Sequence, residues 1–234
     1  MPVNRCALEI GAIGVAVALL ATFAYLLTQA NGMVLANGQP VFGDFIAFWS
    51  AGRAALEGHA DDVHIRALIA QYHQIAAPGV AYVAPWNSPP TFLMIAAALA
   101  LLPYPAAALT FLTLGALIYA AAVRAILPDS RLFIFAITLP AALYHLGSVQ
   151  TGLLVAGVSG LALAWLDKRP HAAGALIGLL AVKPHLALLW PLMLALSGRW
   201  RAFVAAAAST SVFIALAGIV FGFDAYARFF ESLA

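Results

Sequence analysis

The acidic residue best suited to chemistry is Asp44, which lies in the stretch VFGDFIAFWSAGRAALE over residues 41–57. Aromatic and small residues recur there at helical spacing. They are Phe45, Phe48, Trp49, Gly52 and Leu56. The pattern predicts an amphipathic helix on a membrane surface, with its aromatic face among the lipid headgroups. Asp44 is a candidate catalytic base, and the alternative is a helix cap, because Gly43-Asp44 is also common at helix N-termini.

A second candidate, Lys183, lies in the triplet Lys183-Pro184-His185, between the apolar segments 172–182 and 186–196. At about 1.5 Å rise per residue, each segment is too short to cross a bilayer. A lysine at a break between apolar helices indicates a functional site inside a membrane protein. The alternative is a lysine side chain that extends to water.

His145 and Gln150 belong to the polar run 144–152, which follows the apolar segment 132–143. Polar groups at membrane depth line a cavity or pair with one another, so these two are either site residues or mutual partners. Arg53 and Asn87 are weaker candidates. The chain has no nucleotide-binding glycine loop and no HExxH zinc motif. His59, Asp61, Asp62 and His64 lie close together without a recognised metal-binding motif.

The composition identifies the chain as a polytopic membrane protein. Of its 234 residues, 65% are hydrophobic and 9% are charged, against about 25% charged residues in soluble domains. A net charge of +2 provides no basic tract for nucleic acid. We expect a single all-α transmembrane domain. Its parts are a first span over 8–29, an outer loop with interfacial helices over 31–90, a helical bundle over 91–221 broken at 183–184, and an outer tail over 222–234.

The basic residues predict the orientation of these elements, because cytoplasmic loops are rich in lysine and arginine. They are Arg5, Lys168, Arg169, Arg199 and Arg201. With all five on the cytoplasmic side, Asp44 lies on the outer side and at least one helix crosses only half of the membrane. Pro89-Pro90 predicts the start of the helix that re-enters the membrane, because proline is tolerated in a first helical turn.

Five short motifs together point to a known family. They are GDFIAFWSAGRAALEG over 43–58, NSPP over 87–90, GSVQ over 147–150 in place of the commoner Gly-Gln, LLAVKP over 179–184 and GRWRA over 198–202. In these motifs and their order the chain resembles glycosyltransferase family 87, polyprenol-phosphate-mannose-dependent mannosyltransferases of the GT-C architecture. Family members are usually longer, so the chain resembles the N-terminal part of the usual length.

The resemblance implies a GT-C-like helical bundle in a bacterial plasma membrane, with its active face outside. It implies transfer of a sugar, typically mannose, from a polyprenyl phosphate carrier to a glycolipid or glycan acceptor, with Asp44 as the base. The residues that then bind substrate are Lys183, His185, Gln150, His145, Arg53 and Asn87. One carboxylate suffices because the phosphate leaves as a stable anion, whereas a glycosidase needs a second acid. The expected partners are donor, acceptor and membrane lipid; we expect no cofactor, metal or nucleic acid.

The competing hypothesis is a protein without catalytic activity, either a membrane scaffold or a carrier of lipids or small molecules, that keeps a shortened GT-C bundle. Transporters often contain inverted repeats with matched broken helices. This sequence has one clear break, at Lys183-Pro184.

Overall fold

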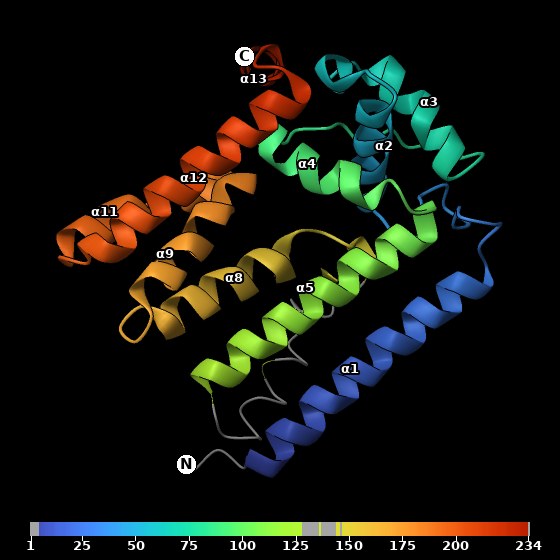
Figure 1. Ribbon diagram of the computed structural model, residues 1–234. Coiled ribbons are helices and arrows are strands. Elements are labelled where there is room, and N and C mark those ends of the chain that lie inside the picture. Colours follow the sequence, from blue (N-terminus) through green and yellow to red (C-terminus); the bar gives the residue numbers. More distant parts are fainter. Residues whose placement is uncertain (1–4, 128–135, 137–143, 146, 234) are drawn as a thin grey trace.

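The computed structural model describes residues 5–127, 136, 144–145 and 147–233, and the elements within them are helices (Figure 1). In chain order they are α1 (Arg5–Thr28), α2 (Phe45–Leu56), η1 (Ala60–Asp62), α3 (Arg66–Ala76), α4 (Pro90–Leu99), α5 (Tyr104–Ile126), α8 (Gly152–Trp165), α9 (Pro170–Leu179), η2 (Leu180–Val182), α10 (Pro184–Ala187), α11 (Trp190–Leu196), α12 (Trp200–Phe221) and α13 (Asp224–Glu231). Two of them, α5 and α12, are long and apolar enough to cross a membrane. The expected all-α membrane class is confirmed.

Helix α2 lies in the core of the bundle, packed against α3, α4 and α5. Its residues Phe45 and Ile46 are fully buried, and Phe48 and Trp49 are nearly so. The predicted position of the aromatic face among lipid headgroups is therefore wrong. The aromatic face of α2 packs instead against aromatic side chains of α4 and α5. The indole Nε1 of Trp49 donates a hydrogen bond to the Leu102 carbonyl at 2.9 Å.

Helix α2 can approach α4 closely because residue 52 is glycine. A Cβ atom at Gly52 would overlap the Ala96 carbonyl of α4. On the α4 side, Phe92 is fully buried, and its ring lies 4.9 Å from that of Phe48, centroid to centroid. The contact fixes the start of α2, and with it Asp44, relative to the start of α4.

Small residues also join α9 to α12. Gly174 and Gly178 are four residues apart on α9, a spacing that lets membrane helices approach closely. A Cβ at Gly174 would meet Ala205 of α12 at 2.8 Å, and one at Gly178 would meet Ser209 at 2.6 Å. The α9–α12 pair forms one wall of the bundle (Figure 1).

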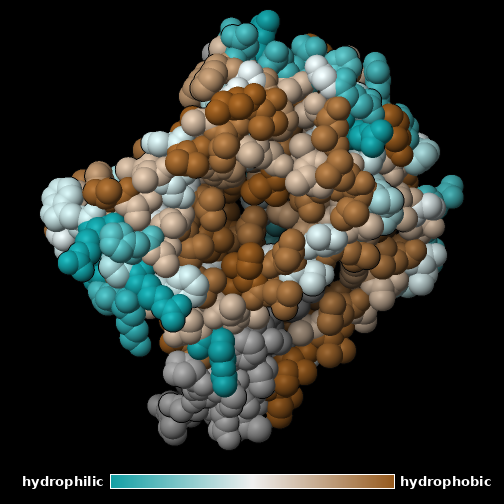
Figure 2. Space-filling model, viewed as in Figure 1, coloured by the Kyte–Doolittle hydropathy of each residue, from teal (hydrophilic) through white to brown (hydrophobic). Residues whose placement is uncertain are grey.

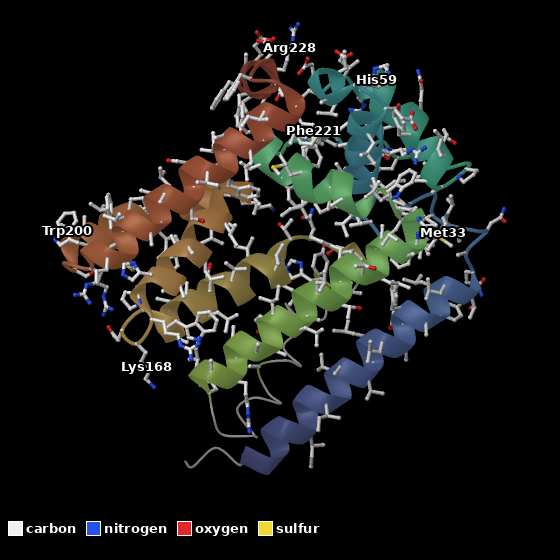
Figure 3. All side chains as sticks on the ribbon, in the orientation of Figure 1. Met33, His59, Lys168, Trp200, Phe221 and Arg228 are labelled. Atoms are coloured by element: carbon white, nitrogen blue, oxygen red, sulfur yellow. The ribbon has the colours of Figure 1, made fainter. Side chains whose placement is uncertain are left out.

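Hydrophilic residues gather at two separate ends of the molecule, with hydrophobic surface between them (Figure 2). One end carries His59 and Arg228, and the other carries Lys168 (Figure 3). At the second end, Arg199 donates a hydrogen bond to the carboxylate of Asp167. This contact joins the α8–α9 and α11–α12 turns, the two basic turns that the sequence predicted to lie on one side.

The structure confirms the predicted helix start at Pro90 and the predicted break at Lys183. Most of the apolar segment 132–143 lies outside the described residues. Within the expected outer tail, the chain forms the amphipathic helix α13, which the sequence reasoning missed.

Candidate functional site

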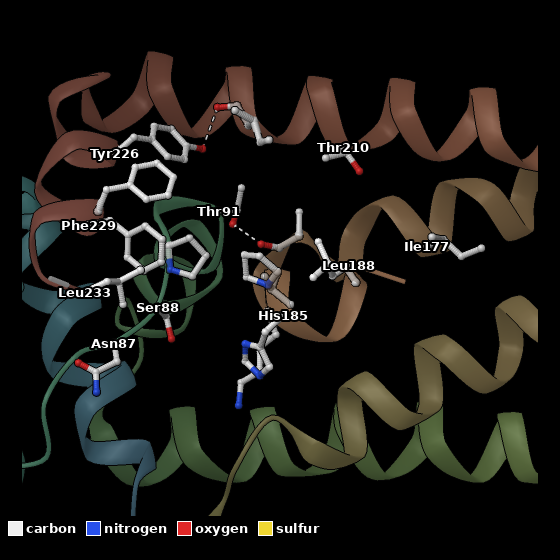
Figure 4. A pocket seen from close by; sticks show the side chains of 18 of the residues that line it. Asn87, Ser88, Thr91, Ile177, His185, Leu188, Thr210, Tyr226, Phe229 and Leu233 are labelled. Atoms are coloured by element: carbon white, nitrogen blue, oxygen red, sulfur yellow. Dashed lines mark hydrogen bonds between the residues drawn. The ribbon is translucent and has the colours of Figure 1, made fainter. Parts of the chain in front are cut away.

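A cavity of about 1340 Å³ opens between the start of α2, the segment 82–91 and the helices from α9 to α13 (Figure 4). Five of the seven predicted site residues line it. They are Asp44, Asn87, Gln150, Lys183 and His185. In Figure 2 the hollow in the hydrophobic face lies over the same elements. The cavity thus collects polar groups from parts of the chain that are far apart in sequence.

Asp44 occupies the N-cap position of α2, but its side chain forms no capping hydrogen bond. The carboxylate Oδ2 instead accepts a hydrogen bond of 2.6 Å from Nε2 of Gln150. Its other oxygen, Oδ1, accepts no hydrogen bond from a described residue. The side chain is half-buried and lines the cavity. Within the described part of the chain, Asp44 therefore presents one carboxylate oxygen without a hydrogen-bond donor.

The backbone around Asp44 is fixed by residues 147–151. The Asp44 N–H donates to the Ser148 carbonyl at 3.1 Å. The preceding residue, Gly43, has a φ of +50°, and a Cβ there would lie 2.9 Å from the Ser148 Cα. Glycine is thus needed at position 43 for both its conformation and its lack of a side chain.

Lys183 lies in the break between η2 and α10, where the following proline favours an extended backbone. Within the described part of the chain, Lys183 forms no ion pair. The exposed side chain of His185 faces the same cavity (Figure 4). The acid and the lysine therefore share one cavity without neutralising each other in a direct pair.

The segment before α4 contributes Asn87 and Ser88 across the cavity from His185 (Figure 4). Ser88 is buried, and its hydroxyl has no hydrogen-bond partner among the described residues. Sequence reasoning missed it because a serine before Pro-Pro also suits an ordinary helix start. The segment is anchored at Ala84, whose N–H donates to Nε2 of the fully buried His73 at 3.2 Å.

Two predicted site residues, Arg53 and His145, are not among the residues that line the cavity. Arg53 is exposed at the far end of α2, and its Nε donates to Glu57 at 2.7 Å. The His145 ring packs against Gly152, where a Cβ would overlap it, and its buried Nδ1 has no partner among the described residues. A substrate-binding role for either stays a prediction.

Most of the remaining cavity wall is apolar. It comes from α9, α11, α12 and α13, and includes Ile177, Leu194, Phe203, Ile214 and Phe229. Helix α13 closes one end, where the Tyr226 hydroxyl donates to the Ile214 carbonyl at 3.0 Å. The cavity thus has a polar end at Asp44 and Lys183 and a long apolar part.

Comparison with known proteins identifies one family. The sequence model of that family, glycosyltransferase family 87, matches residues 86–234. No curated protein and no solved structure matches the chain. The matched stretch contains Asn87, Gln150, Lys183 and His185, whereas Asp44 precedes it and joins it through the hydrogen bond to Gln150.

Proposed function

Because the chain belongs to glycosyltransferase family 87, we propose that this membrane glycosyltransferase uses a polyprenyl phosphate sugar as its donor. The sugar is mannose, the acceptor is a glycolipid or glycan at the outer face of the membrane, and Asp44 is the base. The observation that carries the proposal is the cavity lined by both Asp44 and Lys183, which form no direct ion pair with each other.

In the proposed reaction, Asp44 takes the proton from an acceptor hydroxyl. The hydroxyl oxygen forms a bond to the anomeric carbon of the donor on the face opposite the phosphate, which inverts that carbon. The bond between the anomeric carbon and the phosphate oxygen breaks, and its electron pair leaves with the polyprenyl phosphate. Lys183 stabilises the charge that develops on this leaving group, with His185 and Asn87 as further donors.

The apolar part of the cavity supports a lipid-linked donor. Ile177, Leu194 and Phe203 provide a wall suited to a prenyl chain, while the phosphate stays at the polar end beside Lys183. A nucleotide sugar has no apolar tail for this wall. A cavity with one polar end and a long apolar part therefore favours a donor with a charged head and a long hydrocarbon chain.

The test is transfer of labelled mannose from polyprenyl phosphate to extracted membrane glycolipids in proteoliposomes. We expect the wild-type protein to transfer mannose and Asp44→Asn to lose about 100-fold or more, the range of general base catalysis. Asp61→Asn is the matched control, because Asp61 is exposed on η1 and does not line the cavity. It should retain wild-type activity.

Equal activity of wild type and Asp44→Asn would show that Asp44 is not the catalytic base. Transfer from GDP-mannose but not from the prenyl donor would overturn the donor assignment. Absence of transfer in every variant, with all of them folded, would favour the scaffold or carrier hypothesis.

A further inference from the structure

We propose that Gln150 is a positioning residue that holds the carboxylate of Asp44, and that it does not act as a substrate ligand. The inference rests on the proposed function, because it gives Gln150 a role in the reaction of that site. Its basis is the 2.6 Å hydrogen bond between Gln150 Nε2 and Asp44 Oδ2, which joins residues 106 positions apart.

The orientation of the Gln150 amide follows from its two partners. Its Oε1 accepts a hydrogen bond from the Thr151 N–H at 3.3 Å, while its Nε2 donates to Asp44. A flipped amide would direct its oxygen at the carboxylate of Asp44 and its NH₂ group at the N–H of Thr151, and both contacts would be repulsive. The protein thus uses both ends of this amide before any substrate binds.

The backbone before Gln150 is specialised for this contact. Val149 has a φ of +44°, a region that a β-branched residue rarely adopts, and it is fully buried. Such a conformation persists only where surrounding contacts impose it. The Val149 N–H donates to the His145 carbonyl at 3.0 Å, and the Ser148 carbonyl accepts from the N–H of Asp44. Residues 148–150 therefore hold Asp44 by its backbone and by its side chain.

This arrangement leaves Oδ1 as the oxygen that accepts the proton. With Oδ2 bound to Gln150, rotation of the carboxylate is restricted, so Oδ1 keeps its direction relative to the acceptor hydroxyl. Restricting a catalytic group in this way raises the rate of the chemical step and leaves substrate affinity unchanged. A substrate ligand would act mainly on KM.

The kinetic test uses Gln150→Ala, Asp44→Asn and the double variant in the proteoliposome transfer assay. We expect Gln150→Ala to lower kcat about 10- to 100-fold, with KM for donor and acceptor changed less than about twofold. In the Asp44→Asn background, Gln150→Ala should have no further effect, because the group that it positions is already lost. A raised KM with unchanged kcat, or additive losses, would overturn the inference.

Gln150→Glu adds a readout that a purely structural role would not change. This isosteric variant donates to Asp44 only while the two carboxyl groups share a proton. Its kcat relative to wild type should therefore fall as the pH rises and that proton is lost. Lys183, His145 and His185 are the other ionisable side chains near this pair, and they are present in both proteins. Parallel pH profiles would contradict the proposal.

A thermal unfolding cycle separates this inference from the proposed function. In detergent, Asp44→Ala and Gln150→Ala should each lower the unfolding midpoint, and the double variant should lose less than the sum of both. Additive losses would overturn the contact itself. If the losses in the unfolding midpoint are coupled but the protein transfers no sugar, the proposed function is overturned, and with it the role of Gln150 in catalysis. The hydrogen bond between Gln150 and Asp44 is supported in that case.

Discussion

Lowering the pH should destabilise the protein through His73, the buried histidine that anchors the segment with Asn87 and Ser88. Burial lowers the pKa of His73 from 6.5 to about 4. Its Nε2 accepts the hydrogen bond from Ala84, so the folded protein needs the neutral imidazole. In the unfolded chain the same ring binds a proton below about pH 6.5. The unfolded state then holds more protons, so stability is full above pH 6.5 and decreases as the pH falls towards 4.

The magnitude follows from the two pKa values. A tenfold change in a protonation equilibrium is worth about 1.4 kcal/mol, so His73 should remove about 2 kcal/mol at pH 5 and about 3 kcal/mol at pH 4. For a chain of this length, 1 kcal/mol corresponds to about 2–4 °C in the unfolding midpoint. The expected loss between pH 7 and pH 5 is therefore about 4–8 °C from this residue.

The assay is thermal unfolding of the detergent-solubilised protein at pH 7, 6 and 5, for wild type and His73→Gln. The glutamine oxygen can accept the Ala84 hydrogen bond but does not titrate in this range, so the variant should lose less stability at pH 5. His59→Gln makes the same change at an exposed histidine and should follow the wild-type curve. The reasoning is refuted if His73→Gln and wild type lose stability in parallel.

Three further outcomes are expected. Gly52→Ala should destabilise the protein by about 1–3 kcal/mol, because the added methyl overlaps the α4 backbone. The control is Gly14→Ala, at an exposed site with no atom within 4 Å, which should not lower the unfolding midpoint. Thr91→Val should lose about 1 kcal/mol, because the Thr91 hydroxyl donates to the Ala181 carbonyl at 2.9 Å and joins α4 to the helix break; an unchanged midpoint would contradict this. Ser88→Ala should raise KM for the donor about 2- to 13-fold in the transfer assay, because the Ser88 hydroxyl lines the cavity and has no hydrogen-bond partner among the described residues. An unchanged KM would exclude a contact between this hydroxyl and the phosphate.

Features encoded by a few neighbouring residues could be predicted from the sequence. Pro89-Pro90 marks a helix start because proline has no N–H to donate, and α4 begins at Pro90. Lys183-Pro184 marks a break for the related reason that the residue before proline avoids helical conformation. Both rules act within one helical turn, so no tertiary contact is needed to apply them.

The surroundings of α2 and the contact of Asp44 could not be predicted in this way. An apolar stripe such as that of Phe45 and Phe48 has the same spacing whether it faces lipid or packs against protein. In this structure it packs against α4 and α5. No local pattern connects Asp44 with Gln150, because the two are 106 residues apart and meet only in the folded bundle. Helix α13 was missed because it has only eight residues and follows the last long apolar segment, where the sequence analysis predicted an outer tail.

The distance in sequence between Asp44 and Gln150 also sets an order of events during synthesis. Helices α2, α3, α4 and α5 come from one continuous part of the chain, so the aromatic core around Phe92 can assemble before residue 150 has been made. At about 5–20 residues per second, Gln150 follows Asp44 out of the ribosome by about 5–20 s. The aromatic part of the core can therefore form first, and the carboxylate gains its partner only when the second half of the chain has been made.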